Sequence, residues 1–130
     1  MRNFVLVTGA FDVVHLGHIR MLKYAANIDN EALIVMIDSD ERIRKQKGPS
    51  RPFNCFSDRE EFLHAIEGID YVQPISNDED IILTCKQFRP IRVVGGDWKG
   101  KEIVGAEFCS EIRYFDRIPS YSTTRILDGK

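Results

Sequence analysis

The alternation of short apolar runs with helix-like segments is the feature that most constrains the fold of this chain. Five runs have the length and apolar content of β-strands, and they cover residues 4–7, 32–37, 71–72, 91–94 and 112–115. Strands separated by helices imply right-handed crossovers between parallel neighbours. The pattern therefore predicts an α/β fold, namely a Rossmann-like, doubly wound open sheet of about five parallel strands with helices on both faces.

Helix signals occupy the intervals between these runs. Apolar residues recur at helical spacing from residue 16, and Ser39 begins a short charged helix. Two capping-box patterns, Ser57 with Glu60 and Ser76 with Glu79, predict the starts of two further helices. The second of these should end just before Pro90, because proline disfavours helical geometry in the residue that precedes it.

The composition fits one soluble domain over residues 1–130, with no repeat or linker. A net charge of -2 argues against a global basic field for nucleic-acid binding. We expect a cytoplasmic protein without membrane attachment, because the chain has neither a long apolar run nor a signal-peptide pattern. An odd number of cysteines, 3, without a CxxC pair argues against a disulfide framework or a zinc site and favours small apolar side chains.

Three polar segments follow predicted strands, at residues 8–18, 95–98 and 117–124. In an open parallel sheet, ligands bind beyond the carboxyl ends of the strands, near the point where the strand order reverses. We therefore expect the three segments to meet at one edge of the sheet, although they are far apart in the sequence. The last of them also contains Ser122, Thr123 and Thr124, which predict the cap of a final helix.

The first polar segment contains two histidines at a predicted helix start. His15 and His18 are three residues apart and share one helix face, and Gly17 between them leaves room for a phosphate near the backbone. A helix N-terminus supplies free N–H donors, and two imidazoles stabilise charge that develops during phosphate transfer. Two ordinary helix histidines, or a pair of metal ligands, are the alternatives. The preceding strand and turn favour the phosphate site.

Two motifs at opposite ends of the chain resemble those of the HxGH nucleotidyltransferases, the cytidylyltransferase-like superfamily. Residues 9–22 (GAFDVVHLGHIRML) are similar to the G-x-F-D-x-x-H-x-G-H signature, and residues 121–126 (YSTTRI) are similar to the family's S-T-T motif. The resemblance covers nearly the whole chain. It implies an enzyme that transfers a nucleoside monophosphate from a nucleoside triphosphate to a phosphorylated small molecule and releases pyrophosphate.

Within the superfamily, the chain most resembles the heptose 1-phosphate adenylyltransferase domain, which makes ADP-heptose for cell-surface glycans such as lipopolysaccharide. The shared features are the Lys-Gly-x-x-Arg-Pro-x-Asn loop at residues 47–54, Gly-Gly-Asp at 95–97, and Ile-Val-Gly at 103–105. Trp98, where that group has Tyr, and Arg117, five residues before Ser122, are similar to the glycerol-3-phosphate cytidylyltransferases. A cytidylyltransferase acting on a polyol phosphate and a non-catalytic nucleotide-binding regulator are the alternatives.

The resemblance also implies residue roles. Catalysis is assigned to His15, His18 and Lys47. Nucleotide binding is assigned to Thr8, Gly9, Ala10, Phe11, His15, Gly17, His18, Gly96, Asp97, Arg117, Ser122, Thr123 and Thr124. Acceptor binding is assigned to Asp12, Lys47, Arg51 and Trp98. The expected ligands are ATP or CTP, a phosphorylated sugar or polyol, and Mg²⁺ held mainly by phosphate oxygens rather than by side chains. The family resemblance also suggests a homodimer.

Several of these residues have a purely structural alternative. Asp12 could brace its turn, and Trp98 could serve packing as readily as contact with a base. Lys47 ends a charged run that could be a solvated helix face, although its Gly/Pro-containing loop favours function.

Overall fold

The structure, a computed structural model, describes residues 3–28 and 32–116. Its five strands are β1 (Phe4–Gly9), β2 (Ala32–Asp38), β3 (Tyr71–Ile75), β4 (Ile91–Gly95) and β5 (Glu111–Phe115). All neighbouring strands are parallel, in the order β3-β2-β1-β4-β5. This confirms the predicted doubly wound α/β sheet. The strand order reverses between β1 and β4, so a ligand site is expected at the carboxyl ends of these two strands.

Four helices connect the strands: α1 (Leu16–Ala26), α2 (Asp40–Lys47), α3 (Phe56–His64) and α4 (Asp78–Phe88). Two short 3-10 turns, η1 (Gly96–Trp98) and η2 (Ala106–Phe108), lie between β4 and β5. As expected, Ser39 caps α2, and α4 ends just before Pro90 with Arg89 as its C-cap. The predicted final helix lies outside the described residues.

The starts of α3 and α4 differ from the predicted capping boxes, which were wrong in detail. The N-cap of α3 is Cys55, so Ser57 already lies inside the helix. The chain is fixed here by tertiary hydrogen bonds to Asn54 rather than by a local box. In α4 the N-cap is Asn77, and its box partner is Asp80. Asn is a strong N-cap residue, and the capping box therefore lies one position later than predicted, at Asn77 and Asp80 instead of Ser76 and Glu79.

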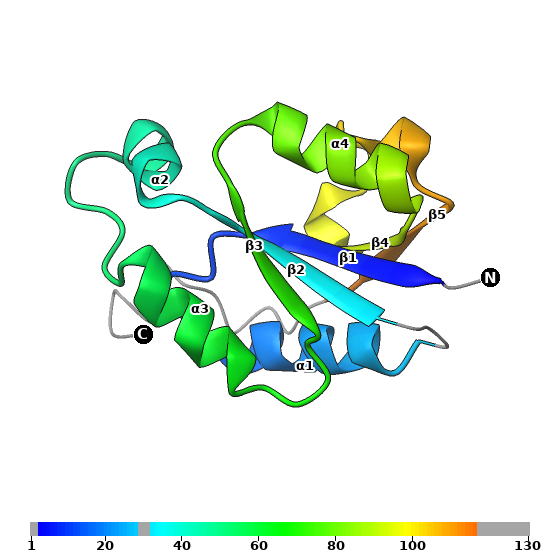
Figure 1. The fold of residues 1–130 in the computed structure, drawn as a ribbon, viewed down its shortest axis with the longest axis horizontal. Helices are drawn as coiled ribbons and strands as arrows, with labels where there is room; N and C mark the ends of the chain where they lie inside the picture. The colour runs from blue at the N-terminus through cyan, green and yellow to red at the C-terminus, as the bar shows by residue number, and fades with distance from the viewer. Residues whose placement is uncertain (1–2, 29–31, 117–130) are drawn as a thin grey trace.

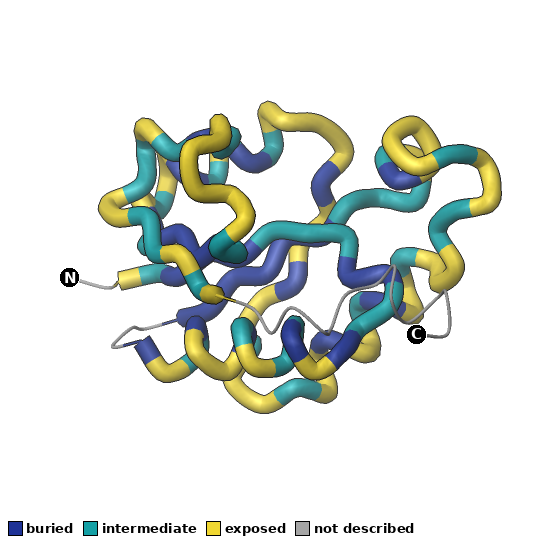
Figure 2. Tube along the Cα trace, turned by 180° about the vertical axis from the view of Figure 1, so that it is seen from behind, coloured by how far each residue is buried: buried dark blue, intermediate teal, exposed yellow. Residues whose placement is uncertain are grey.

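The sheet separates two apolar clusters, as the alternation of side chains along a strand requires. Val5, Val7 and Leu63 belong to the cluster on the face covered by α1 and α3, and Leu6 and Ile81 belong to the cluster under α4 (Figure 1). Strands β1 and β2 run through the buried centre (Figure 2). Within the described part of the chain, no helix is long and apolar enough to span a bilayer.

Candidate functional site

A cavity of about 410 Å³ opens at the point where the strand order reverses. Its walls come from the turn after β1, the first turns of α1, the end of β2 with α2, and the segment that follows β4. The carboxyl ends of parallel strands thus bring together segments that are almost 100 residues apart in the sequence. This is the position where doubly wound sheets bind their ligands.

Many of the predicted site residues line this cavity. They are Thr8, Gly9, Ala10, Phe11, His15, Gly17, His18, Asp97 and Trp98. The first and second polar segments therefore meet at one edge, as expected. Gly96 lies in η1 beside them but does not line the cavity. The third segment, with Arg117, Ser122, Thr123 and Thr124, lies outside the described residues.

The two histidines form the N-terminal cap of α1. His15 is the N-cap residue, and its Nδ1 accepts the backbone N–H of Gly17 at 3.1 Å. The capping box is completed by His18, whose Nδ1 accepts the backbone N–H of His15 at 3.2 Å. The rings stack with centroids 3.9 Å apart. Since each Nδ1 accepts a hydrogen bond, the proton of each neutral ring lies on Nε2, so Nε2 is the donor atom of each ring.

The electrostatics of this helix start favour an anion. The first turn of α1 carries no acidic side chain, so no carboxylate of that turn neutralises the positive end of the helix dipole. His15 is buried and His18 is half-buried, which lowers the local dielectric around their N–H donors. Backbone N–H groups, a dipole end and two imidazole donors are together suited to a phosphate group.

The turn that carries the backbone from β1 to this helix is strained at Phe11. Phe11 adopts a φ of +50°, which is rare for a bulky residue, and its ring is buried. The Phe11 ring lies over Gly9, and a Cβ added at Gly9 would lie 3.0 Å from the ring edge. The centroids of the Phe11 and His18 rings are 5.2 Å apart. Backbone strain of this kind often accompanies functional turns. Here it directs residues 8–11 along the cavity wall.

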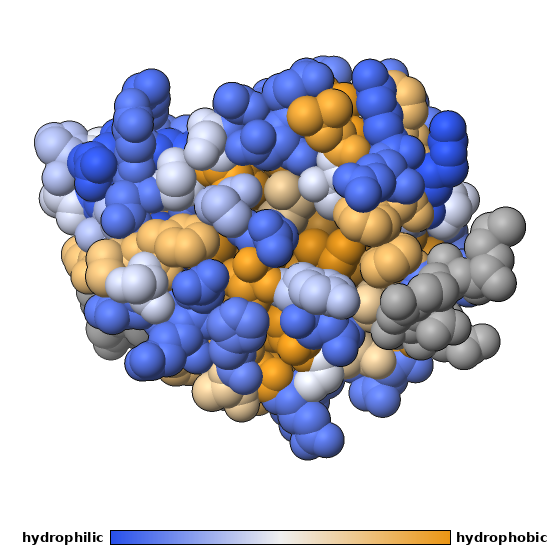
Figure 3. All heavy atoms as spheres, in the orientation of Figure 1, coloured by the Kyte–Doolittle hydropathy of each residue, from blue (hydrophilic) through white to orange (hydrophobic). Residues whose placement is uncertain are grey.

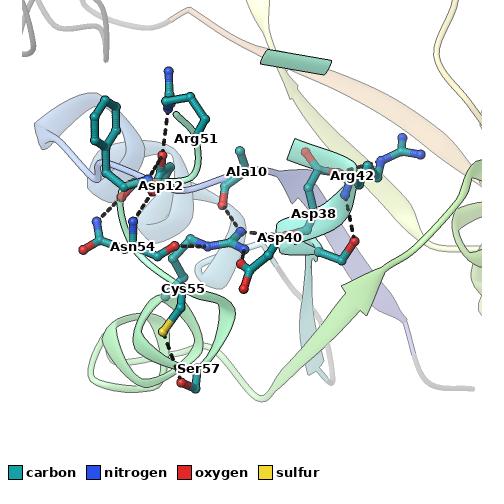
Figure 4. Close-up of polar contacts among 12 residues, drawn as sticks. Ala10, Asp12, Asp38, Asp40, Arg42, Arg51, Asn54, Cys55 and Ser57 are labelled. Carbon is teal, nitrogen blue, oxygen red and sulfur yellow. Dashed lines mark hydrogen bonds and ion pairs between the residues drawn. The ribbon is translucent and has the colours of Figure 1, made fainter. Parts of the chain in front are cut away.

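Asp12 holds the loop of residues 48–55 against this turn (Figure 4). Its carboxylate accepts the backbone N–H groups of Phe53 and Asn54, each at 2.8 Å, and the Nε of Arg51 at 3.0 Å. Burial alone would raise the pKa of Asp12, but these backbone hydrogen bonds and the Arg51 guanidinium outweigh burial and lower it. These contacts match the bracing alternative for Asp12, which does not line the cavity.

Arg51 in this loop and Lys47 just before it do not line the cavity either. Arg51 is paired with Asp12, and its guanidinium lies 4.6 Å from the centroid of the Phe53 ring. Lys47 is the last residue of α2 and is exposed. Figure 3 shows α2 as a hydrophilic projection at the upper left of the molecule. Within α2, the residues that line the cavity are Arg42 and Gln46.

Arg59 is a buried residue of this site that the sequence analysis did not identify. It is 2% exposed, donates to the carbonyls of Ala10 and Asp38 at 2.9 and 2.7 Å, and pairs with Asp40 at 2.7 Å. Its bond to the carbonyl of Asn54 ties α3 to the loop of residues 48–55. Arg59 thereby joins the ends of β1 and β2 with α2. Arg59 lies four residues before the apolar Leu63, so both residues share one face of α3. This spacing was the sequence signal that Arg59 is buried.

Arg92 is the second buried arginine that was missed. It is 3% exposed, lies in β4 and lines the cavity. Its guanidinium donates to the Val104 carbonyl at 2.7 Å and to Thr8 Oγ1 at 3.0 Å. Among the described residues it has no carboxylate partner, and its buried Nε has no hydrogen-bond partner. A charged residue inside an otherwise apolar strand was the available signal.

A resident metal site is not a feature of the described residues. No group of three or more His, Cys, Asp or Glu side chains within them is arranged to hold a metal ion. Asp38, Asp97 and Glu102 do line the cavity, but Asp38 is paired with Arg42 at 2.9 Å.

The chain is similar to a protein family and to curated proteins over nearly its whole length. A model of the Cytidylyltransferase-like family matches residues 6–127. The chain is 37% identical over 127 residues to "Bifunctional protein HldE" of Sulfurimonas denitrificans, which covers 97% of this chain and 26% of that protein. It is 39% identical over 129 residues to the protein of the same name from Campylobacter fetus subsp. fetus, which covers 98% and 28%. The chain thus spans about a quarter of the length of the curated relatives it matches.

A solved structure shares the fold. The lipopolysaccharide core biosynthesis protein from Thermoplasma volcanium superposes with a TM-score of 0.72, over 91% of this chain and 99% of that one. The two sequences are 22% identical, so this likeness concerns the arrangement of the sheet and helices.

Proposed function

The chain belongs to the cytidylyltransferase-like family of nucleotidyltransferases, and from this premise we propose that it transfers the adenylyl group of ATP to a heptose 1-phosphate. The products are ADP-heptose and pyrophosphate. The observation that carries the proposal is the cavity where the capped start of α1 faces the residues that follow β4.

The choice of ATP and heptose rests on sequence likeness. The loop at residues 47–54, Gly-Gly-Asp at 95–97 and Ile-Val-Gly at 103–105 are similar to the heptose 1-phosphate adenylyltransferase domain. The relatives named HldE, matched over nearly the whole chain, support the same assignment. Of these segments, Gly95, Asp97, Ile103 and Val104 contribute to the cavity wall.

The proposed reaction is a direct displacement. A phosphate oxygen of the acceptor attacks the α phosphorus of ATP, a new P–O bond forms, and the bond to the bridging oxygen of pyrophosphate breaks. The Nε2–H groups of His15 and His18, with the N–H groups of the first turn of α1, stabilise the charge on the transferring phosphoryl group and on pyrophosphate. No covalent enzyme intermediate is needed, since positioning and charge neutralisation supply the catalysis.

The remaining residues act around this centre. Asp97 and Trp98 hold the nucleoside or acceptor, while Lys47 and Arg51 approach the phosphates when the loop at residues 48–55 moves toward the cavity. Arg117 with Ser122, Thr123 and Thr124 grips the β and γ phosphates. Mg²⁺ would be held mainly by the phosphate oxygens of the nucleotide and would supply neutralisation of their charge. A homodimer completes the proposal, and size-exclusion chromatography with light scattering tests it.

One observation favours a second candidate, a cytidylyltransferase that acts on glycerol 3-phosphate or a similar polyol phosphate. Trp98, which is shared with that group, is 46% exposed and lines the cavity. An aromatic ring at this position can stack on either base. The two candidates differ in both base and acceptor, so one assay separates them.

The test is pyrophosphate release by the protein with Mg²⁺, each nucleoside triphosphate and a panel of acceptors. We expect the fastest release with ATP and heptose 1-phosphate. Discrimination between bases reaches a factor of roughly 10⁴ when a pocket is built around one hydrogen-bonding edge. Turnover with CTP and glycerol 3-phosphate alone would replace the adenylyltransferase by the second candidate. Tight nucleotide binding without pyrophosphate from any pair would instead indicate a non-catalytic regulator.

A further inference from the structure

Two cysteines from different elements lie in contact behind the wall of the cavity. Cys85 belongs to α4 and is fully buried, whereas Cys109 follows η2 and is partly exposed. Their sulfur atoms are 3.6 Å apart, and Cys109 Sγ is also 3.4 Å from the Gly105 carbonyl. The pair therefore lies at the contact between α4 and the segment that connects β4 to β5.

The surroundings of this pair favour a reactive thiolate at Cys109. As a thiol, Cys109 donates to the Cys85 sulfur, and once Cys109 is deprotonated the Cys85 thiol donates to it instead. That hydrogen bond and the positive charge of Arg92 lower the pKa of Cys109 to about 7. Hydrogen bonding with Cys109 and burial raise the pKa of Cys85. Arg92 Nη1 lies 4.0 Å from Cys85 Sγ, and this guanidinium has no carboxylate partner among the described residues. The exposed member of the pair is thus the nucleophile.

The same groups contact the cavity wall. Arg92 links the Cys85 sulfur to the Val104 carbonyl and to Thr8, and both Val104 and Thr8 line the cavity. Gly105 packs directly on Cys85, because a Cβ added there would lie 2.9 Å from the Cys85 sulfur. A displacement at the sulfur atoms is therefore passed to the cavity wall through one guanidinium and one tightly packed glycine.

We propose that Cys85 and Cys109 form a reversible disulfide with a hydroperoxide as oxidant, and that this disulfide weakens nucleotide binding in the adjoining cavity. The effect on nucleotide rests on the proposed function, whereas disulfide formation does not. A disulfide S–S bond is about 2.05 Å long, so the sulfurs must approach by roughly 1.5 Å. Because Cys85 is anchored in the core under α4, the segment after η2 moves, and Val104 moves with it relative to Arg92.

The chemistry balances without a bound cofactor. The Cys109 thiolate attacks one oxygen of hydrogen peroxide, the O–O bond breaks, and the leaving hydroxide takes a proton to become water. Cys85 sulfur then attacks the resulting Cys109 sulfenic acid, the S–S bond forms, and the S–O bond breaks to release a second water. Two thiols lose two electrons in total, and one peroxide is reduced to two waters. Dithiothreitol reverses the step.

The experiment uses the full chain carrying Cys55→Ser, which removes the exposed third cysteine at the start of α3. After peroxide treatment, peptide mass mapping should find residues 85 and 109 joined with the loss of two hydrogens, and dithiothreitol should restore the thiols. The double variant Cys55→Ser, Cys109→Ser is the matched control. It should retain its melting temperature and nucleotide affinity with and without peroxide.

Nucleotide affinity is measured from the fluorescence of Trp98, which is the single tryptophan of the chain and lines the cavity. Titration with ATP and Mg²⁺, repeated with CTP, should give a dissociation constant at least about fivefold higher for the disulfide form, the lower end of ordinary couplings between sites. By reciprocity, saturating nucleotide should shift the disulfide equilibrium in a glutathione buffer toward the thiols by the same factor.

Each outcome bears on one of the two proposals. Absence of the disulfide, or conversion of Cys109 to a sulfinic acid instead, overturns the inference. A disulfide that leaves nucleotide affinity unchanged overturns the coupling to the cavity. If the disulfide forms and shifts affinity but no substrate pair yields pyrophosphate, the inference holds and the proposed enzymatic function fails.

Discussion

At the scale of single residues, His18 has two roles, one structural and one proposed for catalysis, which two measurements on one variant separate. Its Nδ1 completes the cap of α1, and the residue lines the cavity where the reaction is proposed. We expect His18→Ala to lower kcat by roughly two orders of magnitude or more, because charge stabilisation in the transition state is lost. The lost cap bond should cost about 1 kcal/mol of stability. Turnover and thermal melting measure the two effects. His64→Ala, at the exposed end of α3, is the control that should change neither.

A His18→Ala protein that keeps most of its turnover would remove His18 from the mechanism. Loss of activity together with a collapse of the melting temperature would instead assign His18 to structure alone.

Asp12 should make stability depend on acid pH. Its pKa is lowered in the folded protein, so the stabilisation is fully present above the pKa of an unfolded aspartate, about 3.9, and is lost as pH falls through the folded value. Asp12→Asn should cost about 3 kcal/mol at neutral pH, since it leaves Arg51 and two buried N–H groups poorly matched. Urea unfolding of both proteins from pH 7 down to pH 2 should show this difference shrinking at the acid end. A difference that does not change with pH would contradict the account.

At the scale of elements, two glycines test how the segment between β4 and β5 packs. Gly100 and Gly105 have nearly equal φ values, +79° and +80°. A Cβ at Gly100 would meet nothing within 4 Å, whereas one at Gly105 would lie 2.9 Å from the Cys85 sulfur. Gly100→Ala should therefore cost about 1 kcal/mol for backbone strain alone, and Gly105→Ala about 1–3 kcal/mol more for overpacking. Equal losses in chemical unfolding would show that η2 does not pack against α4 as described.

The loop that follows α2 should respond to ligand. Asp12 holds it through hydrogen bonds with Arg51 and Phe53, and Lys47 and Arg51 are proposed to approach the phosphates when nucleotide binds. Limited proteolysis within residues 47–54 should slow in the presence of nucleotide and Mg²⁺, and Lys47→Ala should lower kcat/KM. Equal cleavage rates with and without ligand would indicate that this loop only connects α2 to α3.

Sequence periodicity predicted the order and type of these elements better than the residues that begin them. The five strands and the helix starting at residue 16 follow from apolar patterns that burial imposes. The capping boxes at Ser57 and Ser76 failed because tertiary contacts at Asn54 and a neighbouring asparagine determine where α3 and α4 begin. A local pattern carries no information about the Asn54 contact with Asp12, whereas at α4 two overlapping local patterns competed and the Asn77–Asp80 box formed.

At the scale of the whole molecule, the position of the site was predictable from the sequence, but the buried arginines that connect the elements around it were not. Parallel topology alone brings residues 8–18 and 95–98 to one edge, so the cavity there was expected. Arg59 and Arg92 bond mainly to backbone carbonyls and a hydroxyl contributed by other elements. A sequence does not show which carbonyls a buried guanidinium will reach.

The most direct test of the account follows the oxygen atoms of the acceptor phosphate. ATP and a heptose 1-phosphate that carries heavy oxygen in its phosphate are incubated with the protein and Mg²⁺, and the products are analysed by mass spectrometry. Direct attack of the acceptor on the α phosphorus predicts that all of the label stays in ADP-heptose and that the released pyrophosphate is unlabelled. Label in pyrophosphate or in free phosphate, or pyrophosphate without ADP-heptose, would contradict nucleotidyl transfer at this site.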